Sequence, residues 1–479
     1  MSLKKQTLSG LVWTVTDTFI LRGSAFLASI YLARILGPAE FGLIGMISIF
    51  VAIGTSLVDS GLSTSLIRTK EADDKDFSTV FYLNLGLSAI VYLSIYFLAP
   101  YVARFYRQEI LIDIMRLYCL SFIITAFSAV QLARLNADMN FKKITILGIP
   151  GTILGIIVGI VLGNLGYGAW SIVMMYLSTQ IVRSFSLWIS SKWRPKLTFS
   201  TEKAKYHYSF GYKLMLSGLI NTTFNYIYNI LIGRFYSPQT LGHYERSRAL
   251  NDYPSSVLTG VITRVTYPIL AKIQDDKQRI AAVYKKMLRI MFFVVAPIML
   301  LAAALAEPLF LLVLGKEWLP AVPLFQVLTL AFMFYPVHVL NLNIFKVFGR
   351  TDLFLKLELI KKVVIVINVL IAFQFGLMGL VWSSVFNSIF ALLVNTYYSS
   401  EMLDYSTLDQ LKDMFFTLVY ALLMFTIVIF VIKLMDDFNL ISQITIGAVV
   451  GIAFYLGINF VLKTYPLRYS LKLIKERKL

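Results

Sequence analysis

The sequence has little charge, histidine or cysteine. Charged residues make up 15% of its 479 positions, and it contains three histidines and one cysteine, Cys119. A single cysteine excludes a disulfide framework and a cysteine-rich metal site, so we expect Cys119 to be a buried structural thiol. His207, His243 and His338 lack the spacing of metal ligands, and the pattern gives no basis for a metal or a cofactor.

The chain instead has an excess of apolar residues. Hydrophobic residues make up 58% of the sequence, and the mean hydropathy is +0.74. A soluble domain of this length does not need so much apolar surface, which indicates a polytopic helical membrane protein. The net charge of +18 does not indicate nucleic-acid binding, because the basic residues cluster in short segments between apolar spans.

The apolar pattern predicts fourteen membrane-spanning helices. They lie near residues 10–36, 40–60, 78–101, 111–135, 144–163, 168–190, 208–235, 239–268, 285–306, 319–345, 354–374, 378–400, 412–433 and 440–462. The lysines and arginines between them favour one side by about five to one, which places both termini in the cytoplasm. The basic lead Met1 to Gln6 has no cleavage signal, so the first span is expected to direct insertion.

Two pairs of similar segments predict a duplicated architecture. Arg34 to Gly42 (RILGPAEFG) is echoed by Arg234 to Gly242 (RFYSPQTLG), and Gly166 to Ser171 is echoed by Gly376 to Ser383. The first pair follows spans that open with Ser-Gly-Leu, at Ser9 and at Ser217. We therefore expect an all-α integral membrane protein with two repeated six-helix lobes and a C-terminal helix pair. The expected parts are a lobe at 1–190, a cytoplasmic linker at 191–207, a lobe at 208–400, and two helices with a basic amphipathic tail at 401–479.

The charged stretch from Arg234 to Pro254 interrupts this apolar pattern. On a helix of about 100° per residue, Glu245, Arg248 and Asp252 share one face, where Arg248 can pair with both acids. Arg246 lies on another face. An arginine at the bilayer centre costs roughly 2.5–3.5 kcal/mol on insertion scales, so we expect Arg246 to face water, a partner or a charged ligand.

Two sets of polar residues lie inside other predicted spans. Asp17 and Arg22 in the first span fit either ion pairing between helices or the wall of a polar cavity. Asn221, Asn225 and Asn229 recur at every fourth position. This spacing fits either hydrogen bonding between helices or a stripe that faces sugar and water.

Two other features fit structural roles. Gly151, Gly155, Gly159 and Gly163 form a four-residue ladder that predicts the close approach of a second helix. Asp59 lies at the inner end of the second span, where a helix-terminal or loop carboxylate that balances Arg68 is the favoured interpretation.

An ordered set of segments resembles the bacterial polysaccharide transporter family. The set comprises Asp59-Ser-Gly-Leu62, Phe77 to Gly86, Ala99-Pro100, Arg104-Phe-Tyr106, Gly166 to Trp170 and Trp193-Arg-Pro195. The resemblance is closest to the branch that exports colanic or teichuronic acid intermediates. This family belongs with the multidrug and oligosaccharidyl-lipid flippases.

The resemblance implies two lobes around a central cavity and transport by alternating access. The implied activity is the movement of an undecaprenyl-pyrophosphate-linked oligosaccharide between the leaflets of the bacterial inner membrane, for cell-surface polysaccharide biosynthesis. Related flippases place arginines of the first and eighth helices in the cavity, and the matching positions are Arg22, Arg246 and Arg248. Asp17 and Glu245 are then candidates for ion coupling.

The asparagine stripe would meet the glycan in such a transporter. The implied partners are the lipid-linked oligosaccharide, the lipid bilayer and the polysaccharide polymerase machinery. Nucleic acid is not expected as a partner, and the chain is expected to be a monomer.

Two alternatives stay open. A cation-coupled multidrug exporter of the same superfamily would share the architecture, but its cationic cargo needs an acidic cavity, whereas arginines match or outnumber acids in spans 1 and 8. A membrane-embedded glycosyltransferase or polymerase usually needs a sizeable loop with acidic residues, which the short outer loops do not provide. We therefore expect a transporter and not an enzyme.

Overall fold

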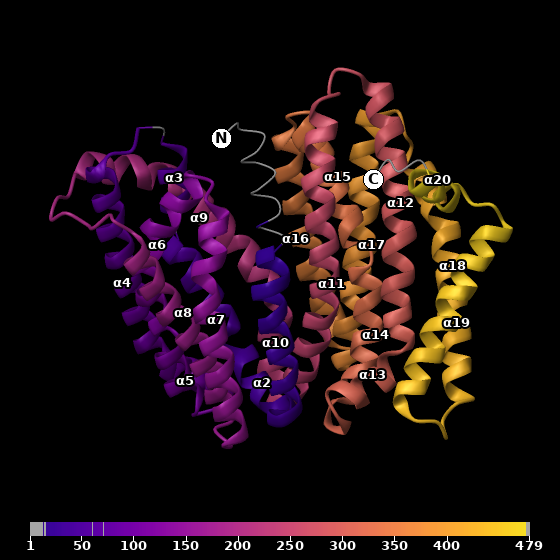
Figure 1. The fold of residues 1–479 in the computed structure, drawn as a ribbon, viewed down its shortest axis with the longest axis horizontal. Helices are drawn as coiled ribbons and strands as arrows, with labels where there is room; N and C mark the ends of the chain where they lie inside the picture. Colours follow the sequence, from indigo (N-terminus) through magenta and orange to yellow (C-terminus); the bar gives the residue numbers. More distant parts are fainter. Residues whose placement is uncertain (1–12, 14–15, 60, 70, 476–479) are drawn as a thin grey trace. The chain divides into compact units, whose positions relative to one another are not determined.

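Helices build the part of the chain that the structure describes. The computed structural model describes all residues except 1–12, 14–15, 60, 70 and 476–479, and the described residues form no β-strand (Figure 1). The all-α fold class is therefore confirmed. The predicted lead Met1 to Gln6 and the tripeptide at Ser9 lie outside the described residues.

Contacts divide the chain into two compact units, Met1–Gly242 and His243–Leu479. The first unit contains η1 (Thr18–Arg22), α2 (Gly23–Asp59), α3 (Leu62–Arg68), α4 (Asp74–Tyr106), α5 (Leu111–Tyr118), α6 (Leu120–Ala137), α7 (Phe141–Asn164), α8 (Ala169–Ser190), α9 (Thr201–Asn225) and α10 (Ile227–Phe235). Helix α11 (Pro238–Ala271) begins in the first unit and continues into the second.

The second unit is built from the remaining helices. These are α12 (Lys277–Ala304), α13 (Ala306–Val313), η2 (Lys316–Trp318), α14 (Ala321–Phe332), α15 (Tyr335–Val347), α16 (Thr351–Phe373), α17 (Gly376–Leu403), α18 (Thr407–Lys433), α19 (Leu440–Val461) and α20 (Tyr465–Lys475). The division falls after α10 because α9 and α10 pack on α2 and α4. The six-helix lobe limits at 190 and 208 stay a prediction.

Among the described residues, ten helical segments are long and apolar enough to cross a membrane. They are Phe19–Arg68, Asp74–Tyr106, Leu111–Ala137, Phe141–Asn164, Ala169–Ser190, Lys277–Ala304, Ala321–Val347, Gly376–Leu403, Thr407–Lys433 and Leu440–Val461. The first two predicted spans run together in one of these segments. Helices α9, α11 and α16 carry more polar or charged residues and do not meet the same test, so the count of fourteen is not confirmed.

The glycine ladder on α7 allows close helix packing, as its spacing predicts: Gly151, Gly155 and Gly159 face α8, and Gly163 faces α2. A Cβ atom added to Gly155 would lie 1.9 Å from the Thr179 hydroxyl oxygen, and one added to Gly151 would lie 2.6 Å from the Thr179 carbonyl oxygen. Such distances leave no room for a side chain. Glycine therefore allows these two helices to approach closely in the first unit.

The repeated segments Arg34–Gly42 and Arg234–Gly242 pack reciprocally within the first unit. In the first copy the helix breaks at Gly37, with φ 77°, just before Pro38. In the second copy the break precedes Pro238, where α11 begins. A Cβ on Gly42 would lie 1.7 Å from the Pro238 carbonyl oxygen, and a Cβ on Gly242 would lie 1.8 Å from that of Pro38. Both copies therefore form the same motif and need glycine at the same place.

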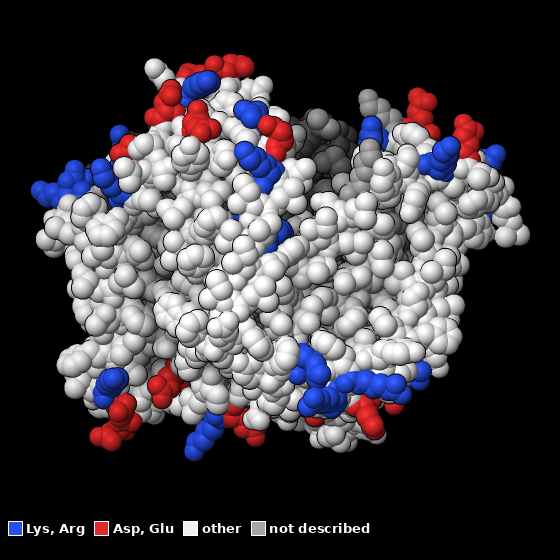
Figure 2. Space-filling model, turned by 180° about the vertical axis from the view of Figure 1, so that it is seen from behind, with Lys and Arg blue, Asp and Glu red and all other residues white. Residues whose placement is uncertain are grey.

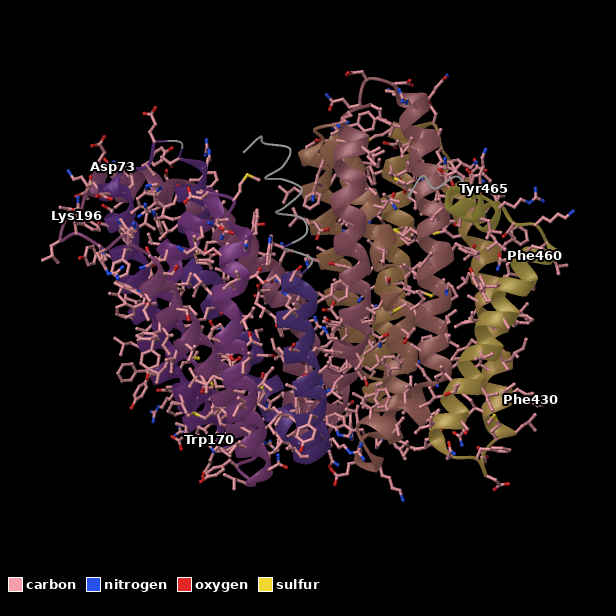
Figure 3. The ribbon with its side chains drawn as sticks, viewed as in Figure 1. Asp73, Trp170, Lys196, Phe430, Phe460 and Tyr465 are labelled. Atoms are coloured by element: carbon pink, nitrogen blue, oxygen red, sulfur yellow. The ribbon has the colours of Figure 1, made fainter. Side chains whose placement is uncertain are left out.

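A buried polar network joins the start of α9 to α3 and α4. The His207 ring is fully buried, with Nδ1 2.8 Å from the Ser65 hydroxyl and Nε2 3.2 Å from an Asp76 carboxylate oxygen. Lys203 Nζ donates to Asp76 at 2.6 Å and to Asp73 at 2.9 Å. Asp73 also caps α4, and the hydrogen bond from Lys203 is the largest cause that lowers its pKa. Asp73 and Lys196 are labelled at this end of the unit in Figure 3.

Charged side chains gather towards the ends of the helices. On the face shown in Figure 2, most of the surface between these ends is uncharged. Large apolar side chains cover the outer faces of α18 and α19, where Phe430 is 61% exposed and Phe460 is 68% exposed (Figure 3). This distribution is that of a multi-pass membrane protein, whose apolar flanks contact lipid.

Candidate functional site

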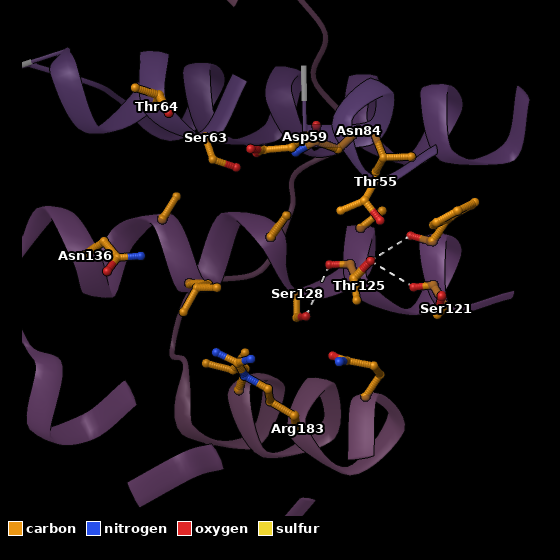
Figure 4. Close-up of a pocket in the computed structure, with 18 of the residues that line it drawn as sticks. Thr55, Asp59, Ser63, Thr64, Asn84, Ser121, Thr125, Ser128, Asn136 and Arg183 are labelled. Atoms are coloured by element: carbon orange, nitrogen blue, oxygen red, sulfur yellow. Dashed lines mark hydrogen bonds between the residues drawn. The ribbon is translucent and has the colours of Figure 1, made fainter. Parts of the chain in front are cut away.

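A polar cavity of about 440 Å³ lies inside the first unit, among α2, α3, α4, α6 and α8 (Figure 4). Its polar lining consists of Thr55, Asp59, Ser63, Thr64, Asn84, Ser121, Thr125, Ser128, Asn136, Tyr176, Gln180 and Arg183. The lining thus combines one acid, one arginine and many hydroxyl and amide groups with apolar side chains such as those of Val58, Ile67 and Phe122. Polar groups inside membrane helices are rare and mark substrate or ion pathways.

Helix α6 supplies a row of hydroxyl groups to this cavity. Ser121, Thr125 and Ser128 are spaced four and three residues apart, which places them on one helix face. The Thr125 hydroxyl donates to the Ser121 carbonyl at 2.8 Å, and the Ser128 hydroxyl donates to the Thr125 carbonyl at 3.2 Å (Figure 4). Because the protons bond to backbone, the hydroxyl oxygens remain able to accept hydrogen bonds from a ligand.

Helix α8 supplies the opposite wall. Tyr176, Gln180 and Arg183 follow the same helical spacing, and all three line the cavity. The ring of Tyr176 stacks on Tyr118, with centroids 4.7 Å apart and planes 7° apart. This stacking holds one side of the cavity rigid, while Arg183 brings a cation with several hydrogen-bond donors.

Asn84 on α4 has the feature most typical of a binding site. Its side chain is 1% exposed, and its Oδ1 atom has no hydrogen-bond partner among the described residues. A buried polar atom without a partner costs about 1–3 kcal/mol. Because Asn84 lines the cavity, a water molecule or a ligand there would satisfy it.

The first-span candidates do not lie in a continuous α-helix: Asp17 directly precedes a π-helical turn, η1, and Arg22 is its last residue. Asp17 is half-buried and Arg22 is exposed. The i→i+5 bonding of such a turn brings positions five apart nearer to one face than an α-helix does, and π-turns often occur at functional sites.

The predicted asparagine stripe is divided by a break in the helix. Helix α9 ends at Asn225, and α10 begins after Tyr226. Asn221 and Asn225 are exposed on α9, whereas Asn229 is fully buried and donates to the Ser48 hydroxyl at 3.2 Å. The structure therefore places Asn229 in helix packing and leaves the other two asparagines accessible.

Arg246 lies buried in α11, in the second unit. It is 4% exposed, and its guanidinium lies 5.9 Å from the centroid of the Trp318 ring. Glu245 and Arg248 are half-buried, and Asp252 is exposed. A buried arginine over an aromatic face is held in one orientation, since cation–π contact favours that geometry.

The sequence reasoning missed a polar stripe on α11 beside Arg246. His243, Ser247, Asn251 and Ser255 recur at every fourth position and contact backbone carbonyls between residues 317 and 332. The Ser247 hydroxyl, for example, donates to the Ala321 carbonyl at 2.8 Å. These bonds fix α11 against η2 and α14, and so fix where Arg246 lies. The four-residue spacing was a visible signal for this stripe.

Sequence reasoning also missed most of the cavity lining in the first unit. It favoured a helix-terminal or loop carboxylate for Asp59, but Asp59 lines the cavity and hydrogen-bonds to Ser63. The helical spacing of the polar residues on α6 and α8 could have identified those two walls. It could not have shown that the two faces meet each other.

Comparisons with known proteins identify relatives of this chain. Residues 31–323 match the family model described as "Polysaccharide biosynthesis protein". The lipopolysaccharide biosynthesis protein WzxC of Escherichia coli is 26% identical over 330 residues, which are 68% of this chain and 67% of that protein. The teichuronic acid biosynthesis protein TuaB of Bacillus subtilis is 24% identical over 363 residues, which are 74% of this chain and 73% of that protein.

Solved structures share the fold. The lipid II flippase MurJ, in an inward closed conformation, superposes with a TM-score of 0.73 at 16% identity and covers 95% of this chain and 100% of its own. An inward-facing multidrug resistance MATE transporter gives a TM-score of 0.61 at 18% identity, over 83% of this chain and 99% of its own. At such identities the likeness shows a common architecture.

Proposed function

This chain belongs to the polysaccharide biosynthesis protein family, and from that premise we propose that it is a membrane transporter of lipid-linked oligosaccharide. The cargo in this proposal is an oligosaccharide on an undecaprenyl-pyrophosphate carrier. The protein moves it from the cytoplasmic to the outer leaflet of the bacterial inner membrane by alternating access. Similarity to the lipopolysaccharide biosynthesis protein WzxC and the teichuronic acid biosynthesis protein TuaB supports this class of cargo.

The polar cavity of the first unit is the observation that carries the proposal. Sugars present many hydroxyl groups, each of which donates and accepts hydrogen bonds. The cavity offers matching hydroxyl and amide groups, an aromatic wall at Tyr176, and the buried Asn84 oxygen. Its volume of about 440 Å³ falls in the ordinary range for ligand sites. We assign the glycan part of the cargo to this cavity.

Arginines contact the pyrophosphate in this proposal. Arginine stays ionised in apolar surroundings, and its planar donors fit phosphate oxygens. Arg22, Arg246 and Arg248 are the proposed contacts, and Arg183 can reach an acidic sugar or the phosphate from within the cavity. Asn221 and Asn225, both exposed, are proposed to meet the glycan during transport, whereas the contacts of Asn229 favour a packing role.

Several finer features belong to the proposal as well. An ion gradient drives transport through Asp17 or Glu245, and both termini lie in the cytoplasm. The transporter acts as a monomer and delivers its cargo to the polysaccharide polymerase machinery.

Complementation tests the proposed function. The full chain is expressed in a panel of bacterial strains that each lack one oligosaccharide-lipid exporter, and surface polysaccharide is measured at matched protein levels. We expect export in at least one strain, and loss of most of that export in Arg183→Gln. Arg104→Gln removes an equal charge from an exposed site outside the cavity and should leave export unchanged. Failure in every strain, or equal export by both variants, would reject the assignment.

A further inference from the structure

The outer flank of the α6–α8 pair carries an apolar groove of about 470 Å³. It is lined by Ile124, Phe127, Ile181, Ser184, Phe185 and Trp188. Phe185 is 65% exposed and Ile181 is 52% exposed. The Trp188 indole N–H donates to the Phe127 carbonyl at 2.8 Å, and the Ser184 hydroxyl donates to the Ile124 carbonyl at 3.1 Å. These two bonds hold the helices together along the groove.

A basic pocket of about 230 Å³ follows the groove at the C-terminal ends of the same two helices. It is lined by Gln131, Arg134, Leu135, Asp138, Lys143, Leu187, Ser190, Ser191, Lys192 and Trp193. The lining has three cations and one acid. Arg134 lies 4.9 Å from the Phe77 ring centroid and is held there by that contact. Asp74 at the start of α4 is paired with Lys196 at 2.7 Å.

Gln131 provides independent evidence that the pocket takes a polar ligand. It is 2% exposed, and neither its amide nitrogen nor its amide oxygen has a hydrogen-bond partner within the described chain. Both atoms belong to a side chain that lines the pocket. An unsatisfied amide among cations matches an anion with hydrogen-bonding oxygens, since the amide N–H₂ donates two bonds.

The two sites lie on one stripe of each helix. On α6 the groove residues Ile124 and Phe127 precede Gln131 and Arg134 at helical spacing. Phe127 and Arg134 are seven residues apart, or about 10 Å along the axis at about 1.5 Å per residue. One amphipathic molecule can therefore place an apolar chain in the groove and an anionic group in the pocket.

We propose that this seam binds an anionic phospholipid, with its phosphate among Arg134, Lys143, Lys192 and Gln131 and an acyl chain along the apolar groove. Basic pockets between membrane helices at the headgroup level attract such lipids. Tryptophans at the same level, here Trp188 and Trp193, are typical of the membrane interface. The bound lipid is a component of the bilayer, distinct from any transported cargo, so the inference does not depend on the proposed function.

Lipid binding by the purified full chain, followed by native mass spectrometry, tests the proposal. The probes are phosphatidylglycerol, phosphatidylcholine of the same chain length, and glycerol 3-phosphate as a soluble phosphate. We expect phosphatidylglycerol to bind at least tenfold more tightly than either of the other two. The double variant Arg134→Gln/Lys192→Gln should lose roughly tenfold or more in that affinity, because basic residues at the membrane surface attract anionic lipid.

Two further variants test the charge of the pocket and the apolar groove separately. Lys142→Gln removes one charge beside Lys143, outside the pocket, and should leave lipid affinity unchanged. Ile181→Trp fills the groove from an exposed position and should weaken phosphatidylglycerol binding without unfolding the chain. Equal binding of phosphatidylcholine, or a phosphatidylglycerol affinity that neither the double variant nor Ile181→Trp lowers, would overturn the proposal. Glycerol 3-phosphate binding as tight as that of the lipid would indicate a soluble phosphate ligand and would also overturn it.

Discussion

The reciprocal glycine contact of the first unit makes a sharp prediction for the variant Gly42→Ala. The added Cβ would lie 1.7 Å from the Pro238 carbonyl oxygen. Non-bonded heavy atoms prefer separations of about 3.5–4.0 Å, so α2 and α11 would have to move apart by roughly 2 Å. The obstacle is backbone, and no rotation of a side chain can relieve it.

The expected loss of stability follows from two opposing effects. Overpacking costs typically 1–3 kcal/mol and occasionally more, and a backbone clash lies at the upper end of that range. Alanine is a better helix former than glycine by about 1 kcal/mol, which offsets part of the cost. We expect a net loss of about 2–3 kcal/mol, which should lower the unfolding temperature by a few degrees, since the shift per kcal/mol falls as the chain gets longer.

Thermal unfolding of the detergent-purified chain measures this change. Gly86→Ala is the matched control, because Gly86 lies in α4 of the same unit and an added Cβ there meets nothing within 4 Å. Gly86→Ala should unfold at the wild-type temperature or slightly above. Gly242→Ala should match Gly42→Ala, since its Cβ would lie 1.8 Å from the Pro38 carbonyl. If Gly42→Ala unfolded at the same temperature as Gly86→Ala, the reciprocal packing would be wrong.

Three other predictions concern the cavity, the polar network and the cargo. Asn84→Leu removes a buried oxygen without a partner among the described residues, so we expect the unfolding temperature to rise by a few degrees while glycan export falls; normal export would exclude Asn84 from the site. The pKa of Asp73 is lowered by Lys203, so this contact stabilises the fold above the ordinary value of about 3.9 and the stabilisation is lost as pH falls below it. Unfolding temperatures measured from pH 7 to pH 2 should therefore fall less steeply in acid for Lys203→Gln, and curves parallel to wild type would contradict this. Expression should not raise resistance to cationic dyes in growth assays, and a gain would instead favour a multidrug exporter.

The architecture could be predicted from the sequence because hydropathy indicates which segments are buried in lipid, and the spacing of small residues indicates where helices pack closely. The ladder from Gly151 to Gly163 predicts close helix contact, and its first three glycines pack on α8 while the fourth packs on α2. Cys119 is fully buried, as its expected structural role requires. The repeat at Arg34 and Arg234 likewise indicated two copies of one motif. These features depend on residues that are close together in the sequence, so they can be recognised from one sequence alone.

Features that depend on which helix faces meet could not be predicted. In the sequence, the row from Ser121 to Ser128 is indistinguishable from polar residues that only pack between helices. The structure shows that Gln180 and Arg183 lie opposite this row across a cavity. The spacing predicts one continuous asparagine stripe, but the helix breaks at Tyr226, and the Asn229 side chain packs against α2, where it donates to Ser48. A helical wheel assumes an unbroken helix, and it does not show which other helix packs against a given face.

The most direct test of the account is the transbilayer movement of an undecaprenyl-pyrophosphate oligosaccharide in liposomes that contain the purified chain. A glycan label on the outer leaflet, accessible to a membrane-impermeant quencher, reports the rate. We predict fast movement with the wild-type chain, and much slower movement with Arg183→Gln, Arg22→Ala or Arg246→Ala at equal reconstitution. Movement no faster than in protein-free liposomes would contradict the proposed transport. Wild-type rates in all three variants would contradict the assignment of the arginines.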